Sequence, residues 1–322
     1  MTKSNTRATA DVAHVVGRKN LIINGGFDVW QRGTSFTPAE VYGYSADRTR
    51  LSSGSTVNIT KESATIEGNV VNTLKHSITS TGVGWNTRYN QRIEEFDYFK
   101  NKTFTLSFWV KSSRTHALSS SQIYFGGGGI NTLDLYADYN MGDVTPTWTK
   151  KVITFSVGDL STATGTYVDL VIGITSDGAA IDIEYAQMQL ELGSVATDFE
   201  HRSYGEELAL CQRYYQRWSG VSGDQSPIAV VCCRSGGSSS TGPLLFKGTM
   251  RGTPTMSYSQ ASDFQVLLGS GTTYNNLTSI GFADKGTDSC LIMPYIPSTT
   301  NNIPGTLRAV SSSAFVAADA EL

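Results

Sequence analysis

Hydrophobic and polar residues alternate along most of this 322-residue chain, which is the pattern of β-strands with one buried face. Segment 103–113, for example, places Phe104, Leu106, Phe108 and Val110 on a single face. Turn-forming Gly, Asp, Ser and Thr separate these segments, as expected for a β-sandwich. Strands are predicted at 103–113, 147–157, 166–175, 181–191, 228–235, 242–250, 253–259, 264–270, 277–284 and 288–296, with one last strand near the C-terminus.

Two of these strands carry more specific expectations. In 181–191, strict alternation puts Ile183, Tyr185 and Gln187 on one face. In 147–157 the apolar positions change face part-way along the segment, which predicts a bulge or a twist.

One segment, 203–218, has helical rather than strand spacing. Ser203 followed by Glu206 forms a capping-box pattern, which marks a helix N-terminus. The apolar residues that recur at three- and four-residue spacing are Leu208, Leu210, Cys211, Tyr214, Tyr215 and Trp218. We expect a helix that connects two β-rich regions.

The fold predicted from these patterns is all-β, in four parts. Residues 1–18 form an N-terminal arm that is too short and polar for a core and should dock on a partner. A β-sandwich spans 19–202, the connector helix spans 203–218, and a second, smaller β-sandwich spans 219–322.

The composition of the chain limits the classes of partner that are expected. Charged residues make up 16% of the chain and the net charge is −3, with no Lys/Arg-rich run, so nucleic-acid binding is not expected. No apolar stretch reaches the length of a membrane span, so membrane insertion is not expected either. The N-terminus lacks the apolar region of a signal peptide, which predicts synthesis in a cytosol without export by the ordinary route.

Catalytic signals are weak. The four cysteines match no zinc spacing and are read as small buried thiols. Neither G-x-S-x-G nor C-x-x-C occurs. Glu94, Glu95 and Asp97 could suggest a glycosidase, but neighbouring residues on a strand face opposite ways, so a surface loop is favoured. The protein is predicted not to be an enzyme.

The segment 84–92 has the composition of a sugar-binding loop. Trp85 and Tyr89 could stack on sugar rings, while Asn86 and Arg88 could hydrogen-bond to hydroxyl groups. The alternative, which is favoured for the two aromatic residues, is that Trp85 and Tyr89 pack beneath the loop.

Two stretches resemble a known family. The first is "NLIINGGFDVWQRGTS" followed by "SADRTRL"; the second is "QMQLELGSVATDFEHRSYGEELALCQRYYQR" at 187–217. Together they resemble bacteriophage tail-fibre and other appendage proteins of the virion, built around a jelly-roll sandwich of the carbohydrate-binding-module kind. The resemblance is good over 19–218 and weak over the last hundred residues.

That resemblance implies a structural virion protein, a tail fibre or spike that attaches to glycans of the host surface. It is expected in the virion, assembled in the host cytoplasm, with its arm on other phage tail or capsid proteins. Such fibres are usually homotrimers, with Leu208, Cys211, Tyr215 and Trp218 packed around the axis. The alternatives are a head fibre or capsid decoration protein without a receptor role and, less favoured, a glycan depolymerase.

For the first turn, the resemblance implies that the glycines after Asn24 allow positive φ, that Phe27 packs inward and that Trp30 covers the sandwich edge. In the carbohydrate-binding relatives an acid at the position of Asp28 can help to hold a structural calcium. This chain has Ala186-Gln187 where a second side-chain donor is expected, so Asp28 could instead be a turn-capping acceptor. No other cofactor is expected.

Overall fold

The computed structural model describes most of the chain, and its strands fall into two compact units. The first unit ends at Glu207 and the second begins at Leu208, so the division lies within helix α2 (Tyr204–Gln212). Neither unit has a described helix long and apolar enough to cross a membrane. The described residues are 18–39, 42–80, 83–84, 86–94, 96–119, 122–126, 141–159, 167–220, 226–233, 239–274, 277–296 and 303–322.

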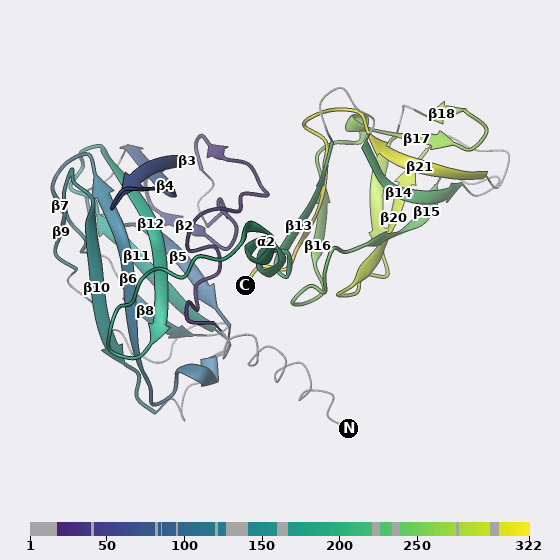
Figure 1. The fold of residues 1–322 in the computed structure, drawn as a ribbon. Coiled ribbons are helices and arrows are strands. Elements are labelled where there is room, and N and C mark those ends of the chain that lie inside the picture. The colour runs from purple at the N-terminus through teal and green to yellow at the C-terminus, as the bar shows by residue number, and fades with distance from the viewer. Residues whose placement is uncertain are drawn as a thin grey trace. The chain divides into compact units, whose positions relative to one another are not determined.

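The first unit is a sandwich of two antiparallel sheets (Figure 1). The six-stranded sheet has the order β1 (Ser35–Phe36), β3 (Thr56–Ile66), β4 (Asn69–Ser80), β12 (Ile181–Leu192), β6 (Thr103–Ser112) and β10 (Thr149–Ser156). The four-stranded sheet has the order β2 (Arg50–Ser53), β5 (Asn86–Ile93), β11 (Tyr167–Thr175) and β8 (Gln122–Gly126). Two further elements lie between these strands along the chain. They are the 3-10 helix η1 (Phe96–Phe99) and a short strand pair, β7 (His116–Ala117) with β9 (Asp143–Val144).

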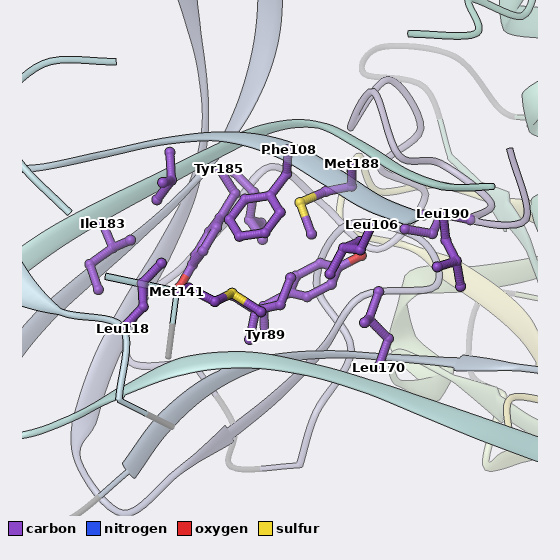
Figure 2. Packing of buried hydrophobic residues seen from close by; sticks show 14 of the residues in the cluster. Tyr89, Leu106, Phe108, Leu118, Met141, Leu170, Ile183, Tyr185, Met188 and Leu190 are labelled. Atoms are coloured by element: carbon purple, nitrogen blue, oxygen red, sulfur yellow. The ribbon is translucent and has the colours of Figure 1, made fainter. Parts of the chain in front are cut away.

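The core of this unit lies between the two sheets. Figure 2 shows Phe108 and Tyr185 from the six-stranded sheet facing Tyr89 and Leu170 from the four-stranded sheet. All four residues predicted to share a face of 103–113 are fully buried. The alternation along that strand therefore predicted its core face correctly.

Two local irregularities differ from the prediction. Strand β10 pairs with β6 in unbroken register, so the predicted bulge in 147–157 is wrong. The bulge lies in β12, where the pairing with β6 shifts between Ala186 and Gln189. Gln187 takes a φ of 49° there and turns away from the core, and Met188 is buried in its place.

The first turn contacts that bulge. A Cβ on Gly25 would lie 2.1 Å from the Met188 carbonyl oxygen, so glycine is required for close approach to β12 rather than for positive φ. Asn24 and Phe27 are the residues with positive φ, 61° and 55°. Phe27 is fully buried and Trp30 packs against the core, as predicted.

The second unit is also a sandwich. Its three-stranded sheet has the order β13 (Tyr215–Ser219), β22 (Phe315–Asp319) and β16 (Thr255–Tyr258). Its seven-stranded sheet has the order β18 (Thr273–Tyr274), β17 (Phe264–Leu268), β21 (Ile303–Ala309), β14 (Ser226–Cys233), β15 (Ser240–Leu245), β20 (Ser289–Tyr295) and β19 (Ser279–Ala283). The 3-10 helix η2 (Ala261–Asp263) precedes β17. The fold is thus all-β with two sandwiches, as predicted, although the single C-terminal strand is two strands, β21 and β22.

Helix α2 begins as predicted and ends early. Ser203 and Glu206 form the capping box: the Glu206 amide donates to Ser203 Oγ at 3.3 Å and the Ser203 amide to Glu206 Oε2 at 3.2 Å. The helix stops at Gln212, and strand β13 follows because residues 215–219 pair with β22. The predicted helix over 203–218 is therefore wrong in its C-terminal part.

Candidate functional site

The outer face of the four-stranded sheet in the first unit carries three arginines. Because successive side chains of a strand point to opposite faces, the arginines of β2 and β5 share the side away from the core. These arginines are Arg50, Arg88 and Arg92. The four strands contain one further charged residue, Asp169 of β11, so the face carries 3 − 1 = +2, whereas the whole chain carries −3.

The charged groups of this face interact across neighbouring strands. Arg92 lies opposite Asp169 in the β5–β11 ladder, and its Nε is 3.5 Å from Asp169 Oδ2. Burial raises the pKa of Asp169, while Arg92 and then Arg50 oppose that rise. The Arg92 guanidinium also lies over the Tyr167 ring, 4.5 Å from its centroid, which is a cation–π geometry.

Two acceptors on this face are buried and unused. Asn90 lies between Arg88 and Arg92 along β5 and opposite Arg50 of β2. Its Oδ1, like Oδ1 of Asp169, has no hydrogen-bond partner among the described residues. Buried polar atoms without a partner are rare in folded proteins, so their presence here is a reason to consider a ligand.

Gly173 makes room for one of the arginines. It pairs with Arg88 across the β5–β11 ladder, and a Cβ at this position would lie 2.7 Å from Arg88 Cγ and 2.3 Å from the Thr87 carbonyl oxygen. The aliphatic part of Arg88 therefore lies close against the bare backbone of β11. A side chain here would displace it.

The structure keeps part of the predicted glycan-binding loop and corrects part of it. Asn86 and Arg88 lie on the outer face, where Asn86 Oδ1 accepts a hydrogen bond of 2.9 Å from Thr175 Oγ1. Tyr89 is not a glycan contact and follows the packing alternative: it is fully buried, its hydroxyl donates to Gln91 Oε1 at 2.7 Å, and its ring meets Phe27 edge-on. Trp85 lies outside the described residues.

Sequence reasoning missed Arg50, Arg92, Tyr167 and Asp169. A signal was present, because the inward face of 166–175 is apolar and so its odd-numbered positions must face outward. What the sequence does not reveal is that β2, β5 and β11 are neighbours, which is what gathers these residues on one surface.

The contacts of Asp28 do not suit a calcium ion. Its Oδ1 accepts a 2.6 Å hydrogen bond from Asn72 Nδ2, and its backbone oxygen accepts one of 3.1 Å from Lys61 Nζ. The positively charged Lys61 ammonium group, which binds the backbone oxygen of Asp28, opposes a second cation at this position. Among the described residues, His, Cys, Asp and Glu form no group of three that could hold a metal. Asp28 acts as an acceptor within the fold.

Of the acids proposed for a depolymerase, Asp97 lies in a surface ion pair. Asp97 lies on η1, and its carboxylate pairs with Lys100 Nζ at 2.7 Å with the Asp97 side chain 84% exposed. Glu95 lies outside the described residues. That the protein is not an enzyme stays a prediction.

The four residues predicted to pack around a trimer axis do not form one exposed stripe. Cys211 and Tyr215 are buried within the chain, and Tyr215 pairs with Asp319 in the three-stranded sheet. Trp218 packs against Phe246, with ring centroids 5.9 Å apart. Leu208 is half-buried on α2. The helical interface is therefore wrong, because the segment after Gln212 is a strand of the second sandwich.

The other cysteines only partly match the prediction of buried thiols. Cys290 is buried, as is Cys211, and burial raises the pKa of Cys290 to about 11. Cys232 is exposed. The side chain of Cys233 is outside the described part of the structure.

The motifs that carry the family resemblance contribute to a network of ion pairs and hydrogen bonds inside the first unit. Arg202 donates to Glu200 Oε2 at 3.1 Å and Glu207 Oε1 at 3.2 Å, and it also donates to the Asn20 carbonyl. Glu200 accepts from the Asn20 amide at 2.8 Å, and Glu207 from the Asn24 amide at 2.6 Å. This buried network ties the first turn to the start of α2.

Comparisons with known proteins show only distant similarity. No protein-family model matches the chain, and no curated protein matches it. A tailspike protein 4 domain of bacteriophage CBA120 is 19% identical over 54% of this chain and 21% of its own, with a TM-score of 0.37. A CBM4 structure is 17% identical over 53% of this chain and 98% of its own, with a TM-score of 0.33.

A tandem CBM22-1–CBM22-2 structure from Paenibacillus barcinonensis Xyn10C is 13% identical, covers 84% of this chain and 91% of its own, and has a TM-score of 0.32. This chain thus spans about a fifth of the tailspike chain and most of the two binding-module chains. At these identities and TM-scores, function has to be argued from the residues of the chain itself.

Proposed function

We propose that the protein is a structural component of a bacteriophage virion, a tail fibre or spike, that binds glycans of the host surface through the outer face of the β2–β5–β11–β8 sheet. One observation carries the binding part: three arginines and a tyrosine gather on one face of a sheet, beside two buried acceptors that have no partner among the described residues. The phage part rests on the motifs at 20–35, 45–51 and 187–217.

The chemistry of this face suits a sugar. Guanidinium groups donate in-plane hydrogen bonds to hydroxyl and carboxylate oxygens. Asn90 Oδ1 and Asp169 Oδ1 are buried near these arginines and have no hydrogen-bond partner among the described residues. A sheet also holds these groups more precisely than a loop does.

The test is binding of the full chain to an array of bacterial surface polysaccharides. We expect a subset of glycans to bind, and the double variant Arg88→Gln, Arg92→Gln to lose them. Lys150→Gln is a control at another surface, because Lys150 is exposed on the outside of the six-stranded sheet and its replacement removes a positive charge there. Absence of binding across the array, or retention by the double variant, would contradict the proposal.

We also propose self-assembly, now through the second unit. Strands β14, β15 and β20 are adjacent and contain no charged residue. Val230 and Leu245 on their outer face are 67% and 70% exposed. We define the apolar face as Val230, Cys232, Pro243, Leu245, Leu291, Met293 and Tyr295. Exposed apolar patches of this kind mark interaction sites, and in a trimer the uncharged faces of three copies would pack against one another around the three-fold axis.

Light scattering tests the assembly. The chain has a mass of 34.7 kDa, so a trimer has 3 × 34.7 = 104.1 kDa. We expect Leu245→Glu to reduce the measured mass toward that of the monomer. Val70→Glu, on a valine 78% exposed in the first unit, should leave it unchanged. A wild-type chain that is monomeric at all concentrations would remove this part of the proposal.

A further inference from the structure

The apolar face of the second unit is bordered by two residues of opposite charge, Arg308 at the end of β21 and Asp284 after β19. We infer that copies of the chain associate head to tail through this face, with Arg308 of one copy paired to Asp284 of the next. This inference rests on the proposed self-assembly and adds the ion pair that orients it. It follows from the isolation of Arg308, the place of Asp284 and the symmetry that the two charges allow.

Arg308 is isolated on its sheet, since the seven strands contain no other charged residue. Because Leu307 and Ala309 are fully buried in the core, Arg308 faces outward, where it is partly exposed. Its Nε is buried, and among the described residues its side chain has no ion pair or hydrogen bond. A charge in partly dry surroundings costs free energy unless it is paired, so an acid from outside the chain would stabilise it.

One acid of the same unit lies near Arg308 in the ladder but does not pair with it. Asp263 stands two residues before Gln265, which is the β17 partner of Arg308. Its Oδ1 accepts a hydrogen bond of 3.1 Å from Gln260 Nε2, and it forms no ion pair with any residue in the described part of the chain. The charge of Arg308 is therefore not neutralised within its own sheet.

Asp284 lies at the opposite edge of that sheet. It begins the loop 284–288 between β19 and β20, which carries one lysine and two aspartates and so a charge of 1 − 2 = −1. Asp288 accepts a 2.5 Å hydrogen bond from Thr249 Oγ1, whereas Asp284 is exposed and has no side-chain partner among the described residues. Four inter-strand steps, roughly 19 Å, separate β21 from β19. The two residues can therefore pair only between copies.

Both charges lie at the same end of the sheet. Arg308 pairs with Pro227 at the start of β14, and the end of β15 adjoins that start because β14 and β15 are antiparallel. The end of β15 pairs in turn with Ser289 at the start of β20, which adjoins the β19–β20 loop. The two edges of the face thus carry opposite charges at one level along the strands.

This arrangement favours one direction of the symmetry axis. A rotation axis along the strands keeps the level and brings the β21 edge of one copy to the β19 edge of the next, so that Arg308 meets Asp284. An axis across the strands would bring each edge onto the same edge of the other copy and leave both charges unpaired. An axis along the strands is also compatible with the proposed trimer.

The experiment is light scattering of the full chain over a concentration series, applied to a double-mutant cycle. The cycle consists of Arg308→Gln, Asp284→Asn and the double variant. Asparagine suits the φ of 46° that residue 284 adopts. We expect each single variant to raise the concentration of half-assembly about tenfold or more, the range for losing a hydrogen bond between charged groups. The double variant should raise it no more than the stronger of the two.

A control and a check on folding accompany the cycle. Lys285→Gln removes a positive charge from the loop that holds Asp284, and it should not weaken assembly. Hydrogen exchange over β14 and β21 checks that each variant keeps the second sandwich. Asp284→Asn changes only an exposed loop residue, so it tests the pair even if Arg308→Gln disturbs the fold.

The outcomes separate this inference from the assembly itself. If Leu245→Glu dissociates the chain but neither Arg308→Gln nor Asp284→Asn weakens assembly, the apolar contact stands and the ion pair is overturned. Single effects that multiply in the double variant would also overturn it, because they would show that the two residues act independently. A wild-type chain that stays monomeric would overturn both the assembly and the inference.

Discussion

Acid should destabilise the first sandwich through one buried histidine, His76 of β4. Its side chain is fully buried, its ring meets Tyr185 edge-on at 5.5 Å between centroids, and neither ring nitrogen has a hydrogen-bond partner among the described residues. Burial lowers the pKa of His76 from 6.5 to about 4. The folded chain therefore keeps this ring neutral at pH values where the unfolded chain protonates it.

The sign and size of the pH effect on the free energy of unfolding follow from proton linkage. Because the unfolded state binds the proton more tightly, this contribution to stability is fully present above pH 6.5 and is lost as the pH falls toward 4. With a pKa of about 4 in the folded state and 6.5 in the unfolded state, moving from pH 7.5 to pH 5 lowers the free energy of unfolding by about 2 kcal/mol.

The assay compares wild type with His76→Leu, which removes the titrating group and keeps an apolar side chain of similar volume. Urea unfolding at both pH values, followed by hydrogen exchange in peptides from β4 and β12, reports on the first unit alone. We expect the wild type to lose about 2 kcal/mol more than the variant between the two pH values. His201→Gln, at an exposed histidine, is the control and should behave as wild type. If His76→Leu loses as much stability as the wild type, the assignment to His76 is refuted.

Three further predictions concern the ion-pair network of Arg202, the outer face of the β2–β5–β11–β8 sheet and the N-terminal cap of α2. Arg202→Met should lower the free energy of unfolding by about 3–5 kcal/mol, since it takes the arginine away from the buried Glu207 carboxylate and the half-buried Glu200 carboxylate. Urea unfolding measures this, and a loss below 1 kcal/mol would contradict it. Gly173→Ala should cost about 1–3 kcal/mol and weaken polysaccharide binding, whereas Gly158→Ala, with nothing within 4 Å of the added Cβ, should do neither. Ser203→Ala should destabilise α2 by about 1 kcal/mol, seen as faster amide exchange confined to residues 204–207.

The sequence predicted most of the core because alternation reports burial directly. Segment 166–175 illustrates this: Val168, Leu170, Ile172 and Ile174 were predicted to share one face, and all four are buried in the sandwich. The same reasoning failed at Gln187, since a bulge changes which residues face inward and leaves no mark in the hydrophobic pattern.

The helix 203–218 failed for a different reason. Leu208, Cys211, Tyr215 and Trp218 have helical spacing, but tyrosine and tryptophan also suit strands. What decides between the two is pairing with β22, a strand that lies about one hundred residues later in the chain. Local propensity is too weak to override such a tertiary partner.

The residues of the recognisable sequence motifs and the residues of the candidate site lie in different parts of the first unit. The motifs that most resemble the phage family, around Asn24 and Arg202, are buried and hold the first turn against the start of α2. A buried charge network tolerates little change, so such residues make a visible signature without touching a ligand. The outer face of the β2–β5–β11–β8 sheet has no sequence motif, because its charged residues come from three strands that become neighbours only in the fold.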